Sequence, residues 1–375
     1  MTPTETLLRE LIALPSVNPA FLPPGDAKAG ENRVARLLAS KAVKAGLTVE
    51  FRKALPNRSN LLVWLRPRGK TRHRIVLAPH LDTVNGTADQ FVPRKTGRRL
   101  YGRGACDTKG SVAAMFSALC QLARQGPKPS ATEIVFIGLV DEENNQSGSR
   151  ALAASGFKAD LAIIGEPTGL LVVTAHKGSL WMRFETRGLS AHGSRPDLGR
   201  NAVHEMARIV DLLETSYAVS LKKRRHPLLG QATVSVGVIN GGSQPNIVPD
   251  RCSILVDRRT LPGESEESVR REIQAMLRQA HLEAVCEDDK FAPCRPLETD
   301  SDLPFVARFL SQAGQRRPAG VDYFSDAAVL AEAGIPSIVF GPGDIAQAHT
   351  ADEWIELAQL EQATEMFLKF LSSLP

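Results

Sequence analysis

Short apolar runs alternate with stretches of helical periodicity through the first half of the chain. Expected strands cover 61–65, 75–78, 134–140 and 161–164, and an expected helix covers 110–124 between the second and third of them. Apolar runs of about four to eight residues bounded by loops are typical of buried strands, whereas longer stretches with apolar residues every three or four positions are typical of helices. This alternation predicts an α/β domain whose central, mostly parallel sheet is flanked by helices.

A different pattern begins near Lys177, in a chain whose 375 residues exceed what one ordinary core accommodates. From there the expected order is strand, helix, two strands, helix and strand, which is typical of a ferredoxin-like βαββαβ domain. The first pattern resumes after Phe291-Ala292-Pro293. We therefore expect a main domain formed by residues 1–177 and 290–375, interrupted by a small α+β domain formed by residues 178–289. The inserted elements are strands at 180–186, 231–239, 252–259 and 282–286 and helices at 201–215 and 267–280.

The composition, 43% hydrophobic and 23% charged, is that of a soluble globular protein. No run of about 18 apolar residues predicts a membrane helix, and residues 1–5 lack the basic and apolar regions of a secretion signal. The five cysteines are scattered without C-x-x-C spacing, which indicates reduced thiols. We therefore expect a cytoplasmic protein that does not bind membranes.

The chain is basic, with a formal net charge of +5 and a pI near 9.0. Its Lys and Arg residues are dispersed among segments such as 66–74, 94–99 and 222–225, without interleaved aromatic residues or a recognisable nucleic-acid-binding module. We therefore expect a solvated basic surface rather than a nucleic-acid site. A mildly positive field could also attract small anionic substrates.

Acidic and imidazole side chains stand at the ends of the expected strands. His80 and Asp82 follow the strand at 75–78, and an extended backbone directs both side chains to the same side, where Asp82 could orient the His80 ring. Alone, such a pair is more simply a strand-end histidine with one hydrogen bond. Similar positions, after a strand or a Gly-rich turn, are taken by Asp107, Glu142, Glu143, Glu166 and His349.

These groups are expected to share one site, because loops beyond the carboxyl ends of strands in an open α/β sheet converge on one crevice. Each acid alone could be a helix cap or a surface charge. Together, however, the carboxylates would raise one another's pKa unless cations neutralise them. Imidazole and carboxylate ligands without thiolate favour a pair of zinc ions, with cobalt and manganese as alternatives. Two ions about 3.5 to 4 Å apart, bridged by a carboxylate and a water, would supply a hydroxide nucleophile and polarise a carbonyl.

The chain contains six short motifs in a fixed order: His80-Leu-Asp82, Gly102-Arg-Gly-Ala-Cys-Asp107, Asp141-Glu142-Glu143, Gly165-Glu166-Pro167, Ala191-His192 and Ala348-His349-Thr350. Taken together, these motifs resemble the co-catalytic zinc amidohydrolase and exopeptidase family, which contains acetylornithine deacetylase, succinyl-diaminopimelate desuccinylase, aminoacylase and glutamate carboxypeptidase. Segments 323–330 and 349–354 are most similar to the acetylornithine deacetylase and desuccinylase branch. The resemblance implies a zinc exopeptidase-like catalytic domain with two metal ions per subunit.

The resemblance also implies a role for each residue of the main domain. Asp82 would orient a ligand, and Glu142 would be the general base that deprotonates the bridging water and then protonates the leaving amine. The peptide bond from Asp107 to Thr108 would be cis, although many relatives have Met or Asp in place of Thr108. The metal ligands would be His80 and Glu166 for one ion, Glu143 and His349 for the other, and Asp107 as the bridge.

Three residues of the inserted domain resemble a second functional set. His192 would reach the active site of a partner subunit and stabilise the oxyanion, which implies a homodimer formed through this lid domain. Asn246 and Arg259 would bind the substrate carbonyl and carboxylate, and an Arg fork suits a carboxylate. Alternatives remain open: His192 could cap a helix, Asn246 could serve a turn, and Arg258 rather than Arg259 could point inward.

The expected activity is metal-dependent hydrolysis of a linear amide bond in an N-acyl amino acid such as N-acetylornithine. A carboxypeptidase or dipeptidase acting on small peptides is the alternative within the family. A non-enzymatic basic binding protein is the alternative from another class, and the presence of every implied ligand argues against it.

Overall fold

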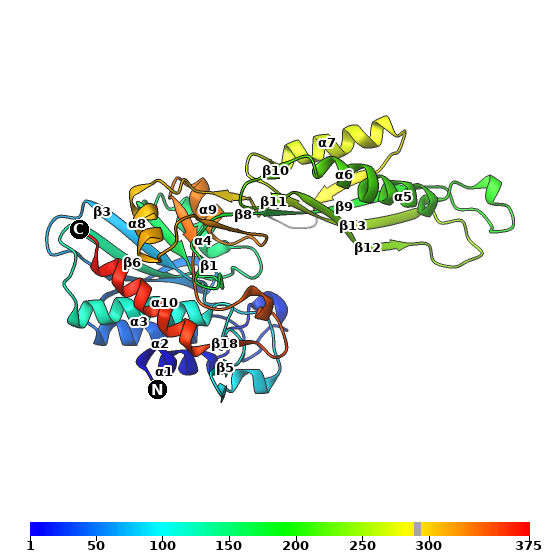
Figure 1. Cartoon of the computed structure of the whole chain (residues 1–375). Helices are drawn as coiled ribbons and strands as arrows, with labels where there is room; N and C mark the ends of the chain where they lie inside the picture. Colours follow the sequence, from blue (N-terminus) through cyan, green and yellow to red (C-terminus); the bar gives the residue numbers. More distant parts are fainter. Residues whose placement is uncertain (289–293) are drawn as a thin grey trace. The chain divides into compact units, whose positions relative to one another are not determined.

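The computed structural model describes residues 1–288 and 294–375, and these fall into two compact units (Figure 1). The predicted domain limits at 177/178 and 289/290 stay a prediction, and the second limit, together with Phe291-Ala292-Pro293, lies outside the described residues. No helix among the described residues is long and apolar enough to cross a membrane. The first unit comprises Met1–Thr174, Thr299–Ala319 and Ser325–Pro375, and the second unit comprises Ala175–Glu298 and Gly320–Phe324.

A mixed sheet forms the centre of the first unit, and the limits between the units fall in or next to its last three strands. The sheet runs in the order β1 (Thr48–Leu55), β2 (Arg58–Leu65), β6 (Thr132–Gly138), β3 (His73–Ala78), β7 (Leu161–Ile164), β17 (Ser337–Val339), β8 (Val173–His176) and β15 (Leu297–Glu298), with β16 (Ala319–Val321) beside β8.

Parallel pairing occupies the middle of this sheet. β3 pairs in parallel with β6 on one side and with β7 on the other, and β7 pairs in parallel with β17. β1 and β2 instead form a hairpin through Pro56 and Asn57, where Asn57 has a φ of 62°. A hairpin joins antiparallel strands, whereas parallel strands need a crossover. The α/β class is confirmed. Because antiparallel strands flank the parallel ones, the sheet is mixed rather than mostly parallel.

Helices cover both faces of the sheet, because strand side chains point alternately to either side. The main core takes Leu61 and Val63 from β2, while Leu62 and Trp64 are buried outside that core. α4 (Ser147–Ala154) and α9 (Ala327–Glu332) contact each other and strands of the sheet on the side away from the main core (Figure 1). The helices of the main core are α1 (Pro3–Ile12), α2 (Asn32–Lys44), α3 (Lys109–Gln125), α8 (Pro304–Gln312) and α10 (Leu357–Ser372).

A small three-stranded sheet, in the order β18 (Trp354–Glu356), β5 (Arg99–Tyr101) and β4 (Arg94–Thr96), lies in the same unit. β18 pairs antiparallel with β5, with Trp354 opposite Tyr101. The loop that precedes β18 therefore lies beside the loop that follows β5. Single turns of 3-10 helix are found at Pro19–Phe21, Ala88–Phe91 and Ile345–Gln347.

The second unit has a four-stranded antiparallel sheet in the order β12 (Thr233–Gly241), β13 (Arg251–Thr260), β9 (Gly178–Arg187) and β14 (Val285–Asp288). Its helices pack on the sheet through a separate core, and the chain order follows the predicted βαββαβ pattern. These helices are α5 (Ala202–Asp211), a π-helical segment (Leu212–Tyr217), α6 (Ala218–Leu221) and α7 (Glu266–Gln279). The remaining short elements are a 3-10 turn (Pro196–Leu198), β10 (Arg225–His226) and β11 (Gly230–Gln231).

β14, the last strand in chain order of this four-stranded sheet, begins three residues later than the predicted start at 282. Leu282 instead completes the end of α7, where its N–H donates to the carbonyl of Leu277 at 2.9 Å. His281, just before it, has a φ of 54°. A left-handed residue after a helix, followed by a buried apolar residue, is a common helix terminus. The apolar residues at the start of the predicted strand therefore close a helix.

Candidate metal centre

The predicted ligands follow the parallel strands at the centre of the first unit. His80 comes two residues after β3, Glu142 and Glu143 follow β6, and Glu166 follows β7. Parallel strands end at one edge of a sheet, which brings their following loops together. The other two predicted ligands are Asp107, which lies between β5 and α3, and His349, which lies between β17 and β18.

Asp107 stands between the two histidines. Its Oδ1 lies 3.1 Å from Nε2 of His80, and its Oδ2 lies 3.3 Å from Nε2 of His349. Nε2 of His80 is also 3.8 Å from Oε1 of Glu166, and Nε2 of His349 is 3.1 Å from Oε2 of Glu143. Ligand atoms of His80, Asp107 and Glu143 all lie within 4.8 Å of one another, which is a spacing that can hold a metal ion. The structure therefore brings the five predicted ligands into one cluster.

The chemistry of this cluster fits divalent cations. Burial, followed by the charge of Asp107, raises the pKa of both Glu143 and Glu166. Hydrogen bonds to Asp107 and Glu143 raise the pKa of His349 to about 10. The buried Oε1 atoms of Glu143 and Glu166 have no hydrogen-bond partner among the described residues. Buried polar atoms without partners are rare in proteins, and cations would satisfy them and offset the repulsion between the carboxylates.

Asp82 makes a contact that the sequence pattern does not predict. Nδ1 of His80 lies 3.0 Å from the carbonyl oxygen of Asp82 and 3.5 Å from its Oδ1. The Asp82 carboxylate accepts the backbone N–H groups of Glu142 and Glu143, each at 3.1 Å, and the Nδ2–H of Asn18 at 2.8 Å. The backbone of Asp82 thus orients the His80 ring, while its side chain fixes the turn that carries two acidic residues.

The sequence pattern also does not predict a buried hydrogen-bond network behind this turn. Nδ2 of Asn18 donates to Oδ1 of Asp141 at 3.0 Å, and Nη1 of Arg58 donates to the same oxygen at 2.8 Å. Arg58 is also paired with Glu31, whose Oε1 accepts the N–H of Asp141 at 3.2 Å. Asp141 has a φ of 69°. Asn18 and Glu31 lie in or next to a Pro- and Gly-rich loop without periodicity, so nothing in the sequence pattern indicated their contribution.

Glu142, like Glu143, is partly buried in the same turn. Burial raises the pKa of its carboxyl group well above the usual range, and the charges of Glu166 and Asp326 act in the same direction. Asp326, which precedes α9, is buried and accepts the Oγ–H of Ser149 at 2.5 Å. A raised pKa makes a carboxylate a better proton acceptor, as a general base requires.

The other predicted residues lie in the second unit. His192 and Asn246 are exposed and lie on neighbouring segments, where the N–H of Gly193 donates to the carbonyl of Asn246 at 2.7 Å. Nδ1 of His192 accepts the backbone N–H of Ser194 at 3.2 Å. The neutral ring therefore carries its proton on Nε2.

The two arginines of β13 differ in their surroundings. Arg258 is buried and donates to Oε1 of Glu264 at 2.6 Å and to the hydroxyl of Tyr217 at 3.1 Å. Arg259 is partly exposed, and its Nε lies 3.0 Å from Oδ2 of Asp257. Arg258 is thus the arginine that points into the core of the second unit, and Arg259 is the one available to a ligand.

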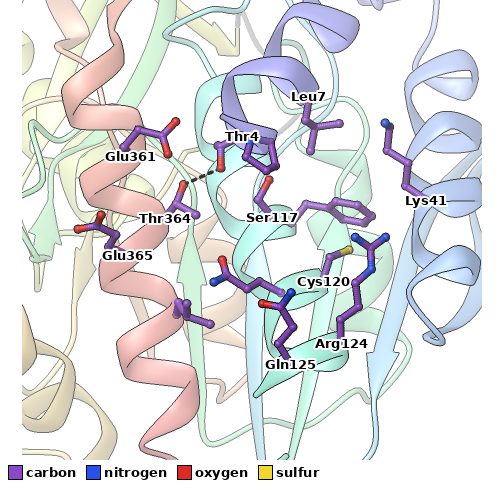
Figure 2. Close-up of a pocket in the computed structure, with 14 residues that line it drawn as sticks. Thr4, Leu7, Lys41, Ser117, Cys120, Arg124, Gln125, Glu361, Thr364 and Glu365 are labelled. Carbon is purple, nitrogen blue, oxygen red and sulfur yellow. Dashed lines mark hydrogen bonds between the residues drawn. The ribbon is translucent and has the colours of Figure 1, made fainter. Parts of the chain in front are cut away.

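A separate pocket of about 530 Å³ lies between α1, α2, α3 and α10 (Figure 2). The basic residues Lys41 and Arg124 line one side of this pocket, and the acidic residues Glu361 and Glu365 line the other (Figure 2). Lys41 is already paired with Glu10 at 2.6 Å. None of the predicted site residues lines this pocket.

Comparison with known proteins shows the family of this chain. Residues 76–373 match the model of peptidase family M20/M25/M40. The acetylornithine deacetylase of Myxococcus xanthus is 33% identical over 334 residues, which cover 84% of this chain and 85% of that protein. The acetylornithine deacetylase of Proteus mirabilis is 31% identical over 376 residues, which cover 96% of this chain and 94% of that protein.

A solved structure has the same fold at lower identity. The aminopeptidase PepT of Bacillus cereus superposes with a TM-score of 0.78 at 22% identity and covers 99% of this chain and 97% of its own. This likeness shows that the two proteins share a fold. The chain belongs to peptidase family M20/M25/M40 and is a hydrolase that acts on amide bonds.

Proposed function

We propose that this protein hydrolyses the amide bond of an N-acyl amino acid with the help of two divalent metal ions, zinc being the expected ion. The observation that carries the proposal is the position of Asp107, whose two carboxylate oxygens each lie close to a different histidine. A carboxylate placed in this way suits a bridge between two ions.

The ligands divide into two groups around Asp107. His80 and Glu166 would hold one ion, because Nε2 of His80 is near Oε1 of Glu166. Glu143 and His349 would hold the other, because Nε2 of His349 is near Oε2 of Glu143. The carbonyl of Asp82 supports this assignment, since it accepts from Nδ1 of His80 and leaves Nε2 of that ring to face the ion.

When bound, the ions would polarise the scissile carbonyl and lower the pKa of a water molecule. Glu142 would accept the proton of that water and pass it to the leaving amine. Two observations support this role. Asp82 fixes the backbone of Glu142, and burial raises the pKa of the Glu142 carboxyl group.

The substrate assignment rests on relatives and on the second unit. Both relatives described above are named acetylornithine deacetylase, so we infer a substrate that carries an acylated α-amino group and a free carboxylate. Arg259 would bind that carboxylate in two parallel hydrogen bonds after exchanging its present partner Asp257. Asn246 would donate to the substrate carbonyl.

We infer a homodimer formed through the second unit. β12 is an edge strand of its sheet and exposes Val238 and Ile239, with exposed fractions of 42% and 54%. Leu189 and Leu198 of the same unit are exposed by 60% and 59%. An apolar edge strand offers unpaired backbone groups to another chain, and a second copy would cover it. His192 would then donate its Nε2–H to the oxyanion in the partner's site.

The scattered cysteines support a cytoplasmic location.

The test is a hydrolysis screen of the metal-loaded protein with N-acetylornithine, other N-acetyl amino acids, N-succinyl amino acids and dipeptides. We expect the highest kcat/KM for an N-acyl amino acid, and no turnover after the metals are removed with a chelator. A preference for dipeptides would instead assign the protein to the dipeptidases or carboxypeptidases. Activity that is unchanged after complete metal removal would reject the metal-dependent mechanism.

A further inference from the structure

We propose that Glu353 is a positioning residue that holds together the two loops on which Asp107 and His349 lie. This inference rests on the proposed function, in which both residues are metal ligands. Glu353 lies four residues after His349 and directly before β18, and its exposed fraction is 1%. It is itself neither a ligand of the proposed centre nor a group that would touch the substrate.

The Glu353 carboxylate accepts four hydrogen bonds from the other loop. Its Oε1 accepts the N–H of Cys106 at 2.9 Å and the N–H of Asp107 at 3.0 Å. Its Oε2 accepts the N–H of Gly104 and the Nη1–H of Arg103, both at 2.8 Å. An ionised carboxylate offers about four acceptor positions and no donor, so this environment suits it fully.

The segment held in this way has little regular structure of its own. Gly102 and Gly104 have φ values of 152° and 82°, which few other residues adopt. Backbone groups in such a segment need partners from elsewhere in the protein. The side chain of Glu353 supplies those partners to the residues that lead into Asp107.

The geometry also explains why the partner comes from the loop of His349. Pairing of β18 with β5 sets Trp354 opposite Tyr101, and the N–H of Gly102 donates to the carbonyl of Glu353 at 3.0 Å. Glu353 therefore starts at a fixed register beside the Asp107 loop. One carboxylate links the backbone of the bridging ligand to the chain segment of a second ligand, so the spacing between Asp107 and His349 depends on it.

Glu353→Gln is the sharpest variant, because it keeps the size of the side chain and replaces one acceptor oxygen with a donor. At least one pair of N–H groups would then face an NH₂ group, and the buried Arg103 would lose its counter-charge. The matched control is Glu356→Gln. Glu356 lies three residues later, at the end of β18, and its carboxylate pairs with the exposed Arg99 at 2.9 Å, away from the Asp107 loop.

The experiment measures metal release rather than turnover. Full-length protein loaded with cobalt or zinc is mixed with a chromogenic chelator, and the visible spectrum of the cobalt form and the unfolding temperature of the metal-free form are recorded in parallel. We expect Glu353→Gln to release metal about 10 to 100 times faster and to change the cobalt spectrum, as loss of a group that orients ligands typically does. Glu356→Gln should resemble the wild type in both measurements.

If Glu353→Gln releases metal at the wild-type rate and keeps the wild-type cobalt spectrum, the inference is overturned. This holds even if the unfolding temperature of the variant is lower, because lost stability alone indicates a purely structural role. If the single variant does not fold, Arg103→Met/Glu353→Gln, which removes both buried charges, is measured against the same expectations. Failure of the wild type to bind metal would refute the proposed function instead, so the two failures are distinguishable.

Discussion

The carboxylate of Asp82 accepts the backbone N–H groups of Glu142 and Glu143 at 3.1 Å each. One residue of the loop after β3 thereby fixes the turn after β6. In the proposed mechanism this turn carries the general base and a metal ligand side by side. The two adjacent acids can address different groups only if the backbone of this turn is held in place.

Replacing Asp82 with Asn tests this contact. The amide group would direct an NH₂ donor at one of the two N–H groups, so the turn should shift. We expect Asp82→Asn to lower metal affinity or kcat by about 10 to 100-fold, as outer contacts of metal sites typically do. Isothermal titration with zinc and steady-state kinetics measure the two effects. Asp302→Asn, at an exposed position, is the control, and equal behaviour of both variants would contradict this role.

Removal of single ligands should change metal content in a graded way. Asp107→Ala removes the residue shared by both histidines, so we expect fewer than one ion per subunit. His349→Ala removes a ligand of one ion only, so we expect about one ion per subunit. Elemental analysis of dialysed protein measures the content. His204→Ala, which changes an exposed histidine of the second unit, should retain both ions. Full content in both ligand variants would refute the assignment.

His176 should make stability depend on pH. It is buried in β8 and its Nδ1 donates to the carbonyl of Lys177 at 2.9 Å, while burial lowers its pKa to about 4. Below its unfolded pKa of about 6.5 the unfolded chain binds a proton that the folded chain does not, so stability falls as the pH drops from about 6.5 to about 4. The loss is at most on the order of 3 kcal/mol.

Urea unfolding of wild type and His176→Gln at several pH values isolates this effect. The wild type should lose stability relative to the variant as the pH falls through that window. A difference in the free energy of unfolding that stays constant between pH 6.5 and pH 4 would mean that His176 has an ordinary pKa in the folded protein.

His192 should act on the partner's site. We expect His192→Ala to bind both metals and to lose transition-state stabilisation of about 2.7 to 4 kcal/mol, as removal of one oxyanion donor does. Mixing His192→Ala with Glu142→Gln should produce heterodimers in which one site is complete. Subunit exchange should therefore restore up to about half of the wild-type rate per heterodimer. Heterodimers without recovered activity would show that His192 serves its own subunit.

Much of this arrangement could be predicted from the chain, because it follows from local pattern. The apolar runs before His80, Glu142 and Glu166 predict strands, and the common edge of parallel strands predicts that these residues meet. Pro56 and Asn57 could have indicated the turn of the β1–β2 hairpin. The other pairing partners of these strands could not be inferred, because they depend on the whole sheet. The cis peptide bond after Asp107, which the family resemblance implied, is present.

Contacts between distant loops could not be predicted, because no local pattern records them. Glu353 accepts from residues about 250 positions earlier in the chain. Asn18 donates to Asp141, which lies 123 positions later. The choice between Arg258 and Arg259 was likewise open, since strand alternation only says that one of them faces the core. The packing of β13 on Tyr217 and Glu264 decides it.

The most direct test of the mechanism is the turnover of Glu142→Gln on N-acetylornithine, or on the best substrate of the screen, at a metal content equal to that of the wild type. The amide cannot accept the proton of the attacking water, so we predict two bound ions per subunit and a kcat lowered by about 10² to 10⁴-fold or more. Near wild-type kcat with both ions bound would contradict the account, because the base would then have to be another residue.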